Sequence, residues 1–210
     1  TFGLCFIGAG SIILDAKIGG GVGLIGIALA HGVILSIMIS ALGGVSGGHF
    51  NPAVTIGFLV TKKQEVGEGI SYIISQLVGG TVAGLLLRAI YAPEVWQKVH
   101  LGTPMLGEGV SVGTGILVEI VLTFFLVTAI WGTAVDDRKP DIGGFGIGLT
   151  LTADILMGGP LTGASMNPAR TFGPALAGGG FDSHLVYWIG PIIGAVIAAV
   201  LYNNILIKKD

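Results

Sequence analysis

Charged side chains are scarce in this sequence: Asp, Glu, Lys and Arg make up 10% of its 210 residues, whereas soluble domains contain about a quarter. The mean hydropathy is +0.88. A chain this poor in charge does not suit a soluble domain, so the composition predicts a protein that crosses a lipid bilayer several times. The net charge of −2 indicates no particular partner, and we expect none among nucleic acids.

Cysteine and reactive side chains are also few. Cys5 is the only cysteine, which excludes an internal disulfide. The ionisable residues within apolar sequence are not spaced as a nucleophile and its base, nor as metal ligands. We therefore expect no enzyme activity, no cofactor and no metal site.

Hydrophobic runs, by contrast, are long. Six apolar stretches cover residues 1–16, 21–43, 68–90, 112–134, 143–158 and 184–207, against the ~20 residues that a helix needs to cross a bilayer. The first stretch is short, and the sequence opens with Thr1 inside it. We expect that the beginning of the first span is missing from this numbering.

One short motif occurs twice. Residues 47–58 read GGHFNPAVTIGF and residues 163–174 read GASMNPARTFGP. Asn caps a helix and Pro fits its first turn, so each copy marks a helix start. Each copy is followed by about ten apolar residues, which at ~1.5 Å per residue cover about half a bilayer. The motif therefore predicts two re-entrant half-helices, whose Gly-rich loops must line a water-filled cavity.

The two copies divide the chain into an internal repeat, about 1–90 and about 112–207, within a single domain of residues 1–210. Three spans per repeat is an odd number, so the second repeat enters the bilayer with the opposite orientation. The two Asn ends then face each other near the midplane. The positive-inside rule places the C-terminus in the cytoplasm, because most basic residues fall on that side: Lys62, Lys63, Arg138, Lys139, Lys208 and Lys209.

The Asn residues give the two helix starts a chemical role. The N-terminus of each half-helix carries free N–H groups and roughly half a positive charge. Each Asn side chain can cap its own helix through oxygen and present its NH₂ group to the lumen. We expect a central clamp that orients water, repels cations and interrupts proton transfer. Its members are Asn51, Pro52, Ala53, Asn167, Pro168 and Ala169.

The two re-entrant loops supply hydrogen-bond acceptors. They are too extended and too rich in glycine to satisfy their own carbonyl groups. Those carbonyls are therefore expected to form a ladder along the lumen, on which water exchanges one acceptor for the next. The residues concerned are Gly47, Gly48, His49, Gly163, Ala164 and Ser165.

Together these features resemble the aquaporin, or major intrinsic protein, family. The likeness rests on the paired Asn-Pro-Ala motifs, on Arg170 directly after the second, on Glu119, and on Tyr187 with Trp188, and it covers essentially the whole chain. It implies an all-α membrane protein with six transmembrane helices and two re-entrant half-helices in an inverted repeat. It also implies a passive channel for water and small neutral solutes, with one pore per subunit of a homotetramer.

Family members have a second constriction, the aromatic/arginine filter, toward the outer mouth. Carried over from the Asn motifs, its four positions fall on His31, Ile155, Ala164 and Arg170. This set looks most like some plant tonoplast intrinsic proteins, which as a group pass water and often ammonia, urea or hydrogen peroxide. Because Ala164 is small, we expect a wider filter than in strict water channels, with Arg170 as a fixed positive charge.

Two acidic residues lie within the apolar stretches. We expect the Glu119 carboxylate to accept N–H groups of a re-entrant loop, which is a structural role. Asp154, next to a filter position, stands where relatives with a similar filter tend to have Asn. It could orient the arginine or the histidine of the filter, or bond to the loop. His100, in the long outer loop, is expected to be a surface residue.

Three other functions stay open at this point. A glycerol facilitator is the nearest, although Thr171, Ala175 and the pair Tyr187 and Trp188 follow the pattern of water channels. A secondary transporter can share inverted repeats and broken helices, but it needs carboxylates for a coupling ion, and only the two buried acids are candidates. The third is a structural role at a membrane junction. We expect the protein in the plasma membrane.

Overall fold

All regular structure in the described part of the chain is helical. The computed structural model describes residues 1–207, so Lys208 and Lys209, assigned above to the cytoplasmic side, lie outside the described residues. The six expected spans form α1 (Phe2–Lys17), α2 (Gly23–Ser46), α4 (Val66–Ile90), α6 (Val112–Ile130), α7 (Phe145–Thr162) and α9 (Val186–Leu201).

Five of these helices are long and apolar enough to cross a membrane, counting the π-helical turns η2 (Trp131–Val135) and η4 (Tyr202–Leu206) that extend α6 and α9. The remaining one, α1, has 16 residues and corresponds to the stretch that the sequence marks as short. The predicted all-α membrane architecture is confirmed.

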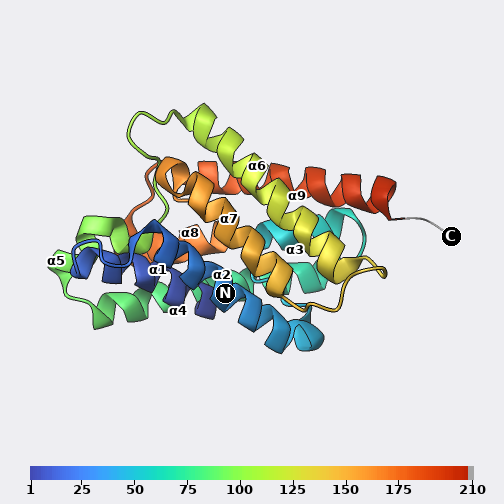
Figure 1. Cartoon of the computed structure of the whole chain (residues 1–210), viewed down its shortest axis with the longest axis horizontal. Helices are drawn as coiled ribbons and strands as arrows, with labels where there is room; N and C mark the ends of the chain where they lie inside the picture. The colour runs from blue at the N-terminus through green and yellow to red at the C-terminus, as the bar shows by residue number, and fades with distance from the viewer. Residues whose placement is uncertain (208–210) are drawn as a thin grey trace.

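The two Asn-Pro-Ala motifs begin two short helices, α3 (Pro52–Val60) and α8 (Pro168–Pro174), the second of which continues as η3 (Ala175–Gly179). The side-chain oxygen of Asn51 accepts the N–H of Ala53 at 2.9 Å, and that of Asn167 accepts the N–H of Ala169 at 3.0 Å. Figure 1 shows both helices inside the bundle, α8 toward the end that carries α5 and α3 toward the end that carries the C-terminus.

Glycine allows helices to approach closely at two crossings. Where α2 crosses α7, a Cβ atom on Gly148 would lie 2.2 Å from the carbonyl oxygen of Gly32. Where α4 crosses α8, a Cβ atom on Gly173 would lie 2.3 Å from the carbonyl oxygen of Gly80. Small residues at such crossings let helices pack tightly in lipid, and the second crossing fixes a half-helix against a full span.

The connection after α4 folds over the end of the bundle that lies away from the C-terminus (Figure 1). It contains α5 (Pro93–Trp96) and the 3₁₀ turn η1 (Gln97–Gly102). We call these residues, 93–102, the strap. Trp96 and Leu101 of the strap pack in a buried apolar cluster with Ala9 and Ile13 of α1. His100 is exposed. The strap is therefore a packed part of the fold, and its η1 turn contacts α8 and η3.

At the opposite end, the connection between η2 and α7 is tied to the end of the last helix. Arg138 bonds to the buried Asp136 and donates a hydrogen bond of 2.8 Å to the carbonyl oxygen of Leu206. The Arg138 guanidinium holds the pKa of the Asp136 carboxyl well below its usual range. The pair therefore stays charged at neutral pH and joins this connection to the end of the last helix.

Candidate functional site

The two cap residues are joined to each other's loops by reciprocal hydrogen bonds. Nδ2 of Asn51 donates to the carbonyl oxygen of Met166 at 2.7 Å, and Nδ2 of Asn167 donates to that of Phe50 at 2.9 Å. Phe50 and Met166 each immediately precede an Asn. An amide NH₂ group has two hydrogens, so one hydrogen crosses to the other loop and the second is left for the lumen. The sequence predicts the lumenal donor but not the cross-link.

The two re-entrant loops share an unusual backbone. Left-handed φ angles occur at three equivalent pairs of positions: Gly47 and Gly163, Gly48 and Ala164, Phe50 and Met166. At Ala164 φ is +44°, a conformation that costs a residue with a Cβ atom roughly 1 kcal/mol. Such strain persists where surrounding contacts impose it.

This backbone leaves carbonyl groups unbonded. Among residues 1–207, no protein donor reaches the carbonyl oxygens of the six loop residues proposed above as the acceptor ladder. Gly47, Gly48, His49 and Ser165 also line the cavity described below. Backbone acceptors next to an open cavity are what a hydrogen-bonding permeant requires.

Glu119 of α6 imposes the shape of the second loop. Its fully buried carboxylate accepts the N–H groups of Ser165 at 2.9 Å and Met166 at 2.7 Å, and the hydroxyl of Thr162 at 2.7 Å. The Thr162 hydroxyl oxygen in turn accepts the N–H of Ala164 at 3.1 Å. One carboxylate thus holds the three successive residues before Asn167, directly or through one hydroxyl.

Neutral side chains hold the first loop instead. Nε2 of Gln76 donates to Oγ1 of Thr55 at 3.0 Å, and Nδ1 of His49 lies 3.2 Å from the same oxygen. The His49 ring also stacks on Phe58, with 4.2 Å between ring centroids. His49 therefore contacts the half-helix that its loop leads into, and its side chain braces the loop.

Arg170, in the first turn of α8, is buried and makes two side-chain contacts. One guanidinium nitrogen donates to the carbonyl oxygen of Gly102 at 2.8 Å, and another lies 3.1 Å from Nε2 of His31. Because arginine only donates, Nε2 must accept, so the hydrogen is on Nδ1, which donates to the carbonyl oxygen of Ile27 at 2.8 Å. His31 is thereby held neutral.

The structure brings two of the four predicted filter positions into direct contact, His31 and Arg170. Ile155 and Ala164 are both buried and belong to one apolar cluster. The hydrogen bond from Arg170 to Gly102 is an interaction at the candidate site that sequence reasoning missed. It uses a backbone carbonyl of the strap, and no side-chain pattern signals such an acceptor.

Asp154 differs from both expectations. It is 6% exposed, and one of its carboxylate oxygens is fully buried without a hydrogen-bond partner among residues 1–207. It bonds neither to Arg170 or His31 nor to the second loop. Successive helical residues point about 100° apart, so a residue beside Ile155 does not share its direction.

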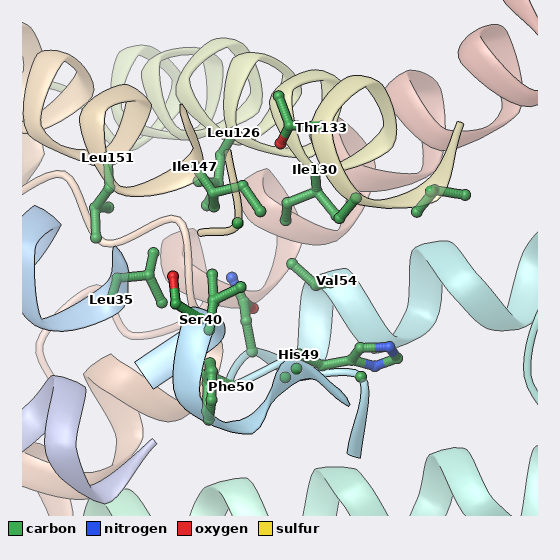
Figure 2. A pocket seen from close by; sticks show the side chains of 18 of the residues that line it. Leu35, Ser40, His49, Phe50, Val54, Leu126, Ile130, Thr133, Ile147 and Leu151 are labelled. Atoms are coloured by element: carbon green, nitrogen blue, oxygen red, sulfur yellow. The ribbon is translucent and has the colours of Figure 1, made fainter. Parts of the chain in front are cut away.

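A cavity of ≈ 600 Å³ leads from the Asn pair toward the end that carries Arg138. One wall is mostly apolar and comes from α6, η2 and α7; the other comes from α2, the first loop and α3. Figure 2 shows Leu126, Ile130, Thr133, Ile147 and Leu151 on one side of the cavity and Leu35, Ser40, His49, Phe50 and Val54 on the other. Asp137, Lys139 and Asp141 line its mouth. The cavity therefore has backbone acceptors along one wall and mostly apolar side chains along the other.

Two capped half-helices that meet inside an inverted repeat of membrane helices define a membrane channel. The model of the family described as "Major intrinsic protein" matches residues 1–202, and the chain belongs to this family, the aquaporins.

Relatives in plants are similar over nearly the whole chain. Aquaporin TIP4-4 of Zea mays is 43% identical, over 100% of this chain and 84% of its own. Aquaporin TIP2-1 of Arabidopsis thaliana is 40% identical, over 98% and 83%. The solved structure of an aquaglyceroporin from Plasmodium falciparum covers 98% of this chain and 92% of its own with a TM-score of 0.86, at 22% identity. That last likeness concerns the fold.

Mercurial compounds are expected to inhibit this protein weakly. Cys5 is fully buried, and Ala164 stands at the predicted filter position, where some members of the family have a mercury-sensitive cysteine. The measurement is water permeability of vesicles before and after low micromolar Hg²⁺. Ala164→Cys is the matched variant and is expected to become sensitive. Strong block of the unchanged protein would contradict the assignment of Ala164 to the filter.

Proposed function

We propose that this protein is a passive channel for water and small neutral solutes, with no covalent chemistry. The reciprocal bonding of Asn51 and Asn167 carries the proposal, because it holds two helix N-termini against each other beside a row of unbonded carbonyls. Water crossing the clamp would accept from the remaining amide hydrogens and donate to the loop carbonyls.

Exclusion of protons and cations follows from the same arrangement. Both half-helix N-termini direct their partial positive charges to one region, and the clamp donates to a water there through both amides. A water that accepts on both sides cannot pass a proton along the chain of hydrogen bonds. Arg170 adds a full positive charge in the outer part of the lumen.

The choice among neutral solutes is assigned to His31, Ile155, Ala164 and Arg170. Only His31 and Arg170 offer polar side chains, and the other two are apolar and small or medium in size. Such a filter suits solutes slightly larger than water that can accept from arginine, and we propose ammonia, urea and hydrogen peroxide beside water.

Stopped-flow measurements on proteoliposomes test the channel. Water permeability is expected to exceed that of empty vesicles, with a low activation energy and a flux that rises linearly with the gradient. Saturating flux with strong temperature dependence would instead indicate a carrier. Swelling no faster than lipid alone would indicate a structural role.

The double variant His31→Phe with Ile155→His tests the filter. It replaces the present pair by the two aromatic residues of strict water channels, of which Phe is larger than the His it replaces. Urea permeability is therefore expected to fall roughly tenfold, the effect of a misfit of about one methylene, while water still passes. The measurement is the ratio of urea to water permeability in the same vesicles. An unchanged solute ranking would show that these positions do not form the filter.

The subunit arrangement and the orientation are part of the proposal. Large apolar side chains such as Ile25 and Leu117 are 68% and 60% exposed, as expected for faces that contact lipid or another subunit, and the family resemblance favours a homotetramer. The positive-inside rule places the Arg138 end in the cytoplasm. The relatives named above are TIP-type, that is tonoplast, aquaporins, so the expectation of a plasma membrane location loses its support.

A further inference from the structure

The filter histidine rests against Gly8, a residue of α1 that is not one of the four filter positions. Gly8 is buried. A Cβ atom built on it would lie 2.4 Å from both Cδ2 and Nε2 of His31, far inside the ~3.5–4.0 Å at which non-bonded carbon atoms pack. The imidazole ring therefore occupies the space that any side chain at position 8 would fill.

The His31 atoms next to Gly8 belong to the part of the ring that contacts the filter arginine. Nε2 of His31 accepts from Arg170 at 3.1 Å, while Nδ1 is bonded to the carbonyl oxygen of Ile27 at 2.8 Å. A side chain at position 8 would meet the ring at the nitrogen that holds the arginine. Because residue 8 is glycine, the His31 ring can pack against α1 while its Nε2 atom still contacts Arg170.

The second partner of Arg170 rests on the next residue of the same helix. Gly102 presents its carbonyl oxygen to Arg170, and a Cβ atom on Gly102 would lie 2.7 Å from Cβ of Ala9. Two consecutive small residues of α1 therefore support both groups that hold the filter arginine.

We propose that Gly8 is a positioning residue that sets the width of the filter, and with it the range of solutes that pass. This inference rests on the function proposed above. A methyl group at position 8 turns the His31 ring away from α1 and into the lumen, breaks its contact with Arg170 and narrows the passage, although residue 8 touches no permeant.

The test compares Gly8→Ala with Gly3→Ala in proteoliposomes, for water, ammonia, urea and glycerol. Gly3 lies on the same helix, and a Cβ atom there would meet Met38 no closer than 3.6 Å, an ordinary contact. Gly8→Ala is expected to lower, by roughly tenfold, the permeability of the largest solute that the unchanged protein conducts, relative to water. If only water passes, its permeability per channel is the measured quantity. Gly3→Ala is expected to change neither the solute-to-water permeability ratio nor the water permeability per channel.

A double-mutant cycle separates this effect from a general disturbance of packing. In a His31→Ala background no ring stands against position 8, so adding Gly8→Ala is expected to have no further effect on selectivity. Contacting residues show such non-additivity, whereas independent sites add. An equal effect of Gly8→Ala in both backgrounds would overturn the proposal, as would an unchanged ratio in the single variant.

Folding and function can be told apart in the same experiment. If Gly8→Ala alone does not yield folded protein, the double variant Gly8→Ala with His31→Ala decides. Recovery of a monodisperse, water-permeable protein supports the steric link, and failure to recover overturns it. If the unchanged protein conducts nothing above lipid background, the proposed channel function fails, which is a different result from normal flux that is indifferent to position 8.

Discussion

Replacing Glu119 by Ala is expected to destroy the second re-entrant loop and with it the channel. The carboxylate accepts two backbone N–H groups and one hydroxyl in a fully buried place. A buried donor that loses its partner costs about 1–3 kcal/mol, so the loss for three donors is roughly 3–9 kcal/mol. A chain of this size loses about 2–4 °C per kcal/mol, so the midpoint of thermal unfolding in detergent should fall by roughly 6 °C or more. Water permeability should be lost.

Asp154 provides the matched control for this experiment. It is also a buried acid in an apolar helix, but it has no hydrogen-bond partner in the described chain. Asp154→Asn removes no hydrogen bond, so the midpoint of thermal unfolding of this variant is expected to stay within about 3 °C of the unchanged protein. The midpoint can also rise, because burying an unpaired carboxyl group is costly. Equal losses for Glu119→Ala and Asp154→Asn would mean that the loop does not depend on the Glu119 bonds.

Replacing Arg170 by Ala is expected to let protons and small cations leak. Two unit charges 4 Å apart repel by about 4 kcal/mol at an effective dielectric constant of 20, which is roughly three powers of ten in a rate or equilibrium. The half-helix ends remain in the variant, so we expect a proton flux raised at least about tenfold rather than the full amount. The measurement is the decay of a pH gradient in proteoliposomes loaded with a pH-sensitive dye.

Arg170→Lys separates charge from geometry. Lysine keeps the positive charge but is a compact ammonium without the planar fork of arginine, so it cannot reach Gly102 and His31 as arginine does. The Lys variant is expected to remain tight to protons while its ratio of urea to water permeability changes. If the proton flux through Arg170→Ala is as low as through the unchanged protein, the charge at this position is not the cation barrier.

Local sequence patterns were enough to predict the membrane architecture and the position of the two Asn residues. Hydrophobic length marks a span because every span must bury its own backbone bonds in lipid, and that property is local to the segment. The caps at Asn51 and Asn167 are local too, since each accepts from an N–H two residues on. Glu119 could be assigned to a loop because a buried carboxylate needs donors, although the sequence did not show which donors.

The contacts between these parts, by contrast, became visible only in the folded chain. Each Asn bonds to a backbone carbonyl of the other loop, and Arg170 bonds to the backbone carbonyl of Gly102. Because every residue has a backbone carbonyl, the residue type does not indicate which one will accept such a bond. The role of Gly8 rests on an absent side chain, and the isolation of Asp154 on what surrounds it. Such contacts join segments far apart in the chain, 68 residues from Gly102 to Arg170 and 139 from His31 to Arg170. They depend on how the helices pack, which local sequence patterns do not record.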